Sequence, residues 1–76
     1  MPKSVTGYNA EIKKGRDAGM KYCQAWQNEL TIASAALTTE LTGKKISLAA
    51  YNVKRDDLNK QTADLNRCIA SLNKNA

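Results

Sequence analysis

Residues 23–41 read CQAWQNELTIASAALTTEL. Apolar side chains recur along this stretch in steps of three or four, at Cys23, Trp26, Leu30, Ala33, Leu37 and Leu41. Such spacing places them on one stripe of an α-helix. The stretch therefore predicts a long amphipathic helix, which we expect to run from about residue 8 to residue 42. Gly43 follows it, and glycine readily takes the left-handed conformation that ends many helices.

A second apolar stripe predicts another helix over about residues 47–73. Its members are Leu48, Tyr51, Leu58, Leu65, Cys68 and Leu72. Only a turn at about residues 43–46 separates the two helices, and so short a connection makes them antiparallel neighbours. The sequence therefore predicts an all-α, antiparallel two-helix hairpin that forms a single domain over residues 1–76.

The N-terminal segment has no facing partner within such a hairpin. It also contains Gly15 and Gly19, each of which lowers helix propensity by up to ~1 kcal/mol. We therefore expect residues 1 to about 18 to be loosely ordered, or to become ordered only on binding.

Trp26 lies in the middle of the first stripe, and two helices alone cannot enclose so large a ring. A third element must cover it, either the N-terminal segment or another molecule. We predict that the incompletely covered stripe packs against other helices, with an interface at Trp26, Leu30, Leu37, Tyr51 and Leu58. Chains of this size often rely on self-association, a disulfide or a metal for stability.

The residue types needed for catalysis are scarce. The chain has no His, and its seven Asp and Glu residues form no metal-loop or paired-carboxylate spacing. Two Cys residues cannot complete a four-ligand zinc site in one chain. We therefore expect no enzymatic activity, no catalytic residue, no cofactor and no metal.

Membrane and secretory segments are not evident in the sequence either. No run approaches the ~20 apolar residues of a membrane span, and the first five residues do not lead into the apolar core of a secretory signal. We expect a cytoplasmic chain, or one exported by a signal-independent route.

Cys23 and Cys68 fall on the two apolar stripes, about one turn apart across the predicted hairpin. A disulfide between them would close a long loop and could stabilise the fold by roughly 3–4 kcal/mol. The alternative is that both are small buried thiols, as free Cys commonly is. Because the redox compartment decides between them, both interpretations remain open.

The chain is basic, with twelve Lys and Arg against seven Asp and Glu, a net charge of +5 and a pI near 9.4. The clearest basic patch is Lys13, Lys14 and Arg16, to which Lys54, Arg55 and Arg67 could add. Acidic residues are mixed among most of these positions, which is typical of a solvated helix surface. The charge pattern therefore favours a protein partner, with nucleic acid as an alternative.

Several short strings resemble the needle subunits of bacterial type III secretion systems. They are Thr6-Gly7-Tyr8, Asp17 with Gly19, Gln27-Asn28-Glu29-Leu30-Thr31, and Leu48-Ala49-Ala50-Tyr51. The resemblance covers about two thirds of the chain. It implies a small helical hairpin that leaves the cell without a Sec signal and polymerises into a hollow helical filament.

Three functional hypotheses follow from these patterns. The first is a structural or assembly protein that packs helix faces against other subunits, by self-association into an oligomer or a filament. The second is a small phage- or plasmid-type inhibitor or chaperone that binds one protein target. The third is a basic hairpin that binds nucleic acid, with an affinity that falls steeply as salt rises.

Overall fold

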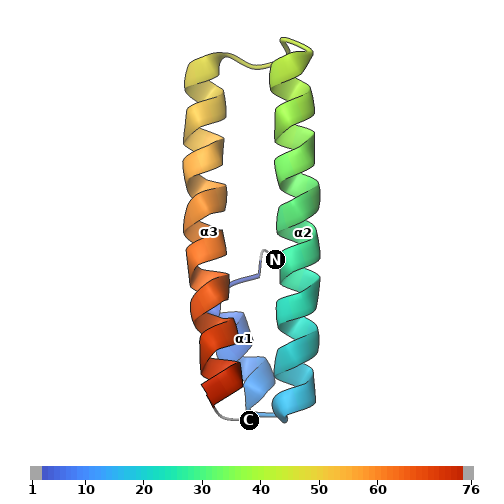
Figure 1. Cartoon of the computed structure of the whole chain (residues 1–76), viewed down its shortest axis with the longest axis vertical. Coiled ribbons are helices and arrows are strands. Elements are labelled where there is room, and N and C mark those ends of the chain that lie inside the picture. The colour runs from blue at the N-terminus through green and yellow to red at the C-terminus, as the bar shows by residue number, and fades with distance from the viewer. Residues whose placement is uncertain (1–2, 75–76) are drawn as a thin grey trace.

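The computed structural model describes residues 3–74 as three helices: α1 (Val5–Ile12), α2 (Arg16–Thr42) and α3 (Leu48–Lys74). Helices α2 and α3 lie antiparallel along the whole length of an elongated molecule of 44 × 19 × 15 Å (Figure 1). The chain between them forms the tip of the hairpin, and α1 packs at the opposite end, the base. No helix among the described residues is long and apolar enough to cross a membrane.

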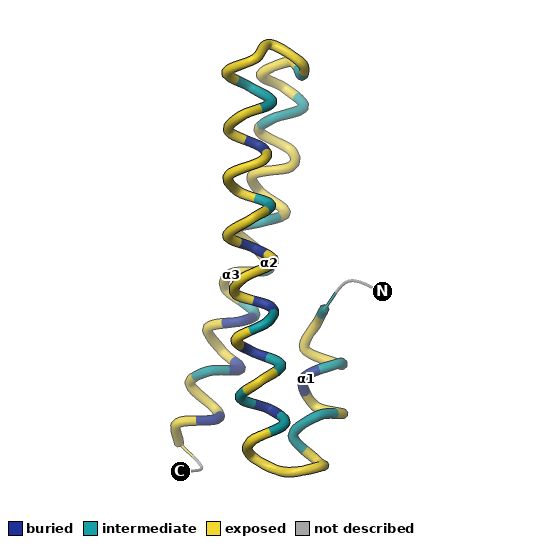
Figure 2. Tube along the Cα trace, turned by 90° about the vertical axis from the view of Figure 1, so that its right-hand side faces the viewer, coloured by how far each residue is buried: buried dark blue, intermediate teal, exposed yellow. Residues whose placement is uncertain are grey.

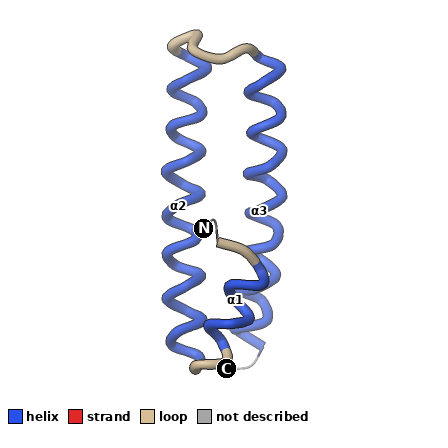
Figure 3. The backbone as a smooth tube through the Cα atoms, turned by 180° about the vertical axis from the view of Figure 1, so that it is seen from behind, coloured by secondary structure: helices blue, strands red, loops and turns tan. Residues whose placement is uncertain are grey.

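The predicted hairpin is therefore correct for α2 and α3, but the fold has three helices rather than two. The prediction of one helix from about residue 8 is wrong, because the chain reverses direction after Ile12 (Figure 3). Gly15 makes the reversal possible with φ 144° and ψ 163°, a backbone conformation that is essentially restricted to glycine. The second predicted helix, residues 47–73, matches α3 to within one residue at each end.

Helix α1 corrects the expectation of a loosely ordered N-terminal segment, of which residues 1 and 2 lie outside the described part. The Ser4 side chain caps α1 by accepting a hydrogen bond of 3.2 Å from the Gly7 N–H. Ser4 is also joined to α2, because its N–H donates to the Tyr22 hydroxyl (2.8 Å) and its carbonyl accepts from that hydroxyl (3.2 Å). Lys3 extends this anchor with an ion pair of 2.7 Å to Glu29.

The α2–α3 turn lies where the sequence predicts it, but a different residue takes the left-handed conformation. Gly43 caps α2 with an ordinary φ of −78°, and the left-handed conformation belongs to Lys44 at φ 57°. Ser47 then caps α3 by accepting a hydrogen bond of 3.1 Å from the Ala50 N–H.

The core lies near the base, where all three helices meet. Its buried members are Tyr8, Cys23, Trp26, Leu30, Leu65 and Cys68. Trp26 is 2% exposed, and Tyr8 of α1 belongs to the same cluster, so the N-terminal segment is the third element that covers the ring. Figure 2 shows the buried segments concentrated in the part of the hairpin beside α1.

Candidate functional site

The half of the hairpin toward the tip consists of two helices only, and an open groove runs between them. The groove has a volume of about 560 Å³. Its lining residues are Ala33, Ala36, Leu37 and Glu40 of α2, and Val53, Lys54, Asp57 and Leu58 of α3. We call these eight residues the distal groove.

The distal groove continues the face of the hairpin that α1 covers at the base. On α2, Gly19 lies against the Ile12 side chain of α1. Tyr22 and Glu29 contact Ser4 and Lys3, the two residues that precede α1. Steps of three or four from these positions lead directly to Ala33, Ala36 and Glu40. The same face therefore holds a helix near the base and is uncovered near the tip.

Apolar side chains form the floor of the groove, and charged groups stand among them. Val53 is 70% exposed, which is high for a β-branched apolar residue that faces a groove. Glu40 and Lys54 form an ion pair of 3.6 Å that links α2 to α3. Asp57 accepts a hydrogen bond of 2.8 Å from the Gln61 amide. The groove thus presents one cation and two carboxylates around an apolar strip.

The opposite flank of the hairpin differs in character. A smaller hollow of about 310 Å³ lies there, and five of its seven lining residues are polar. It is formed by Gln27, Leu30, Thr31, Ser34, Thr62, Leu65 and Asn66. Of these two hollows, the distal groove is the one suited to packing against another helix.

The residues predicted as an interface are divided by the structure. Trp26, Leu30 and Leu37 are buried within the single chain, whereas Tyr51 and Leu58 are half-buried. Burial of Trp26 under α1 removes the reason for expecting a second molecule to cover it. Leu37 and Leu58 are the members of the predicted set that also line the distal groove.

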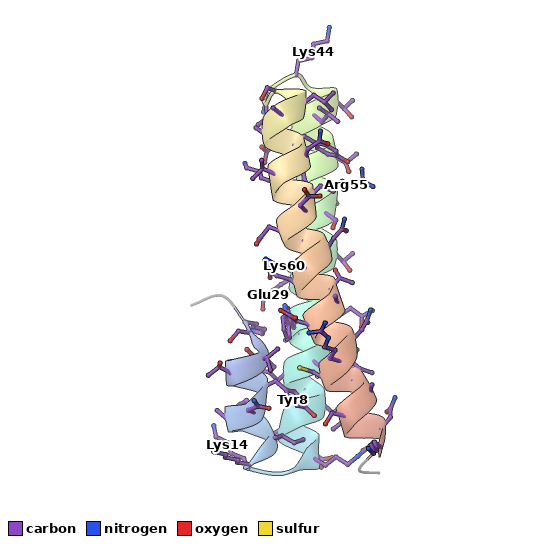
Figure 4. All side chains as sticks on the ribbon, turned by 90° about the vertical axis from the view of Figure 1, so that its left-hand side faces the viewer. Tyr8, Lys14, Glu29, Lys44, Arg55 and Lys60 are labelled. Atoms are coloured by element: carbon purple, nitrogen blue, oxygen red, sulfur yellow. The ribbon has the colours of Figure 1, made fainter. Side chains whose placement is uncertain are left out.

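Among residues 3–74, the Tyr8 hydroxyl and the Trp26 indole nitrogen are buried without a hydrogen-bond partner. Burial raises the pKa of the Tyr8 hydroxyl above its usual value, with smaller contributions from the Cys23 and Cys68 thiols. Figure 4 shows Tyr8 where α1 meets the hairpin. Each buried polar group without a partner costs about 1–3 kcal/mol of stability. Packing of α1 over Trp26 is therefore opposed by the desolvation of the Tyr8 hydroxyl and the Trp26 N–H.

Cys23 and Cys68 are both free thiols, buried in the same core cluster. Burial raises the pKa of each thiol, which keeps both protonated and unreactive near neutral pH. In this structure they act as small apolar core residues. Among residues 3–74, no group of three or more His, Cys, Asp and Glu side chains is placed to hold a metal ion.

The predicted basic patch lies at the base, away from the distal groove. Lys13 and Lys14 follow α1 and Arg16 begins α2, and Lys14 forms an ion pair of 2.7 Å with Glu11. Arg67 also has an acidic neighbour, Asp64, at 3.6 Å. Figure 4 shows Lys14 and Lys44 at opposite ends of the molecule. The structure does not gather the basic residues into one surface.

No protein-family model matches the chain, and neither a search of curated proteins nor one of solved structures finds a match. The resemblance to needle subunits remains a prediction from the sequence.

Proposed function

We propose that this protein is a non-catalytic helical assembly protein, and that it self-associates by packing the distal groove of one copy against the distal groove of another. One observation carries the proposal: the face that α1 covers at the base continues toward the tip as an open apolar groove. An apolar helix face that is left uncovered on a small domain marks an interaction surface.

The charges of the groove favour a second copy as the occupant. Lys54 stands among the carboxylates Glu40 and Asp57, so the surface carries both signs. Such a surface can pair with itself, because each cation can face a carboxylate of the other copy. A nucleic acid would instead require a uniformly positive surface.

Only the distal half of each hairpin takes part, so the interface belongs to the small class that buries below ~1,200 Å² in total. We expect weak association, with a Kd on the order of 100 µM. Packing of the groove against itself uses each groove once and closes the assembly, whereas a filament, the form that the resemblance to needle subunits implies, would need a second contact surface.

Analytical ultracentrifugation from about 5 µM to about 1 mM tests the proposal. The informative variant is Ala36→Glu, which places a charge on the α2 side of the groove. The matched control is Ala35→Glu, because Ala35 is exposed and faces away from the groove. We expect the mass of the wild type to rise with concentration, Ala36→Glu to weaken association at least tenfold, and Ala35→Glu to behave as the wild type.

Two results would refute self-association through this groove. One is a wild-type chain that stays monomeric up to about 1 mM. The other is an Ala36→Glu variant that associates as strongly as Ala35→Glu. Circular dichroism of each variant checks that its helical content is unchanged.

A further inference from the structure

We infer that the second copy docks antiparallel, about a two-fold axis that crosses the middle of the distal groove, and that the product is a closed dimer. This inference rests on the self-association proposed above. It adds the direction of the partner, the residues that face one another and the final number of chains.

The position of helix α1 determines the direction in which the second copy can dock. This helix stands on the same face as the groove, at the base, and projects to one side of the hairpin (Figure 2). If two hairpins packed face to face in parallel, their α1 helices would meet at the same level and hold the distal halves apart. An antiparallel partner avoids this collision, because its tip lies over the groove and its own α1 lies beyond the tip of the first copy.

The length of the groove suits this arrangement. The ion pair of Lys3 with Glu29 marks where the N-terminal segment, just before α1, reaches α2, and the tip begins at Gly43. The uncovered stretch of α2 between these points is centred on Ala36. When two such stretches overlap completely, the tip of each copy reaches the start of α1 in the other. Ala36 then lies close to the axis, where its small side chain lets the two α2 helices approach closely.

The charged groove residues of α3 are consistent with the same two-fold axis. The groove residues of α3 are Val53, Lys54, Asp57 and Leu58, so their midpoint falls between Lys54 and Asp57. A two-fold axis through that midpoint places Lys54 of each copy opposite Asp57 of the second copy. Symmetry makes two such pairs, which flank the apolar strip. Each groove is then used once, so the assembly stops at two chains.

A charge-swap experiment tests this geometry. In a dimer of the Lys54→Asp variant, each new carboxylate would lie opposite Asp57 of the second copy, so both pairs would repel. In a dimer of the Asp57→Lys variant, each new cation would lie opposite Lys54 of the second copy, with the same result. We expect each variant by itself to associate at least tenfold more weakly than the wild type. An equimolar mixture restores both opposite-charge pairs, so its association should return to within about threefold of the wild type. The mass should level off at two chains.

Lys60→Asp provides the matched control, because it makes the same substitution on α3 at an exposed position outside the distal groove. It should leave association unchanged. The mixture also separates the interface from effects within one chain: loss of the Glu40–Lys54 ion pair cannot be rescued by a second variant.

Each alternative result has a distinct meaning. A wild type that does not associate refutes the proposed self-association and the geometry with it. A wild type that associates, combined with a mixture no stronger than the single variants, refutes only the antiparallel two-fold arrangement. A mass that continues to rise beyond two chains refutes closure and indicates a filament.

Discussion

Replacement of Trp26 by Ala tests whether the base is a closed core within one chain. The ring is 2% exposed and packs with Tyr8 of α1 and with residues of both long helices. It also makes an edge-to-face contact with Tyr22, with ring centroids 6.0 Å apart. Removal of the ring should therefore loosen all three helices together.

The expected cost follows from these contacts. Truncation of a buried Trp to Ala usually costs about 3–5 kcal/mol, including the cavity that it leaves. The indole N–H of Trp26 is buried without a partner, so its removal also relieves a penalty of about 1–3 kcal/mol. The midpoints of these two ranges give a net loss of about 2 kcal/mol. A domain of 76 residues has a total free energy of unfolding of about 4–11 kcal/mol, so the variant should be marginally stable.

Urea denaturation at about 5 µM, followed by far-ultraviolet circular dichroism, measures this loss in the monomer. Trp26→Phe is the matched control. It keeps a ring and removes only an unpaired N–H and some volume, so it should cost about 1 kcal/mol. A Trp26→Ala variant as stable as the wild type would refute the closed core, because removal of a ring from a filled core leaves a cavity.

Three further predictions use the same measurement. Gly15→Ala should cost about 1–3 kcal/mol, because φ 144° strains any residue with a Cβ, whereas Gly43→Ala at φ −78° should cost less. Tyr22→Phe should cost about 0.5–1.5 kcal/mol, because it removes the hydrogen bonds that tie the start of α1 to α2. The free energy of unfolding should fall as pH rises above about 9, because the thiols ionise in the unfolded chain while Cys23 and Cys68, whose pKa values are raised by burial, stay protonated in the folded chain. Replacing both cysteines with Ala should make the free energy of unfolding less dependent on pH in this range.

The two long helices could be predicted because their signals are local. The apolar stripe through Trp26 and Leu30 repeats at the helical period, and Gly43 marks the turn, so neither inference needs knowledge of distant contacts. Helix α1 was missed for a different reason. Gly15 is compatible both with a continuous helix of lower propensity and with a reversal of the chain. Which of the two forms depends on whether α1 can pack against the other helices.

A local signal for α1 does exist. Val5, Tyr8 and Ile12 share one face at helical spacing, and Ser4 precedes them as a cap, which describes a short separate helix. The candidate site was harder to predict. Leu37 and Leu58 were singled out from the stripes, but Val53 and Asp57 became relevant only once α1 was seen to cover the base and leave the rest of that face open.

The buried residues are distributed unevenly along the hairpin, and this should appear as a gradient in amide hydrogen exchange. Around Trp26 three helices share one cluster, so those amides should exchange only when the whole chain unfolds. Toward the tip, Leu37 is the buried apolar residue on α2, and the amides beyond it should exchange through local fraying. If a second copy occupies the distal groove, exchange there should slow with protein concentration while the rates around Trp26 stay the same.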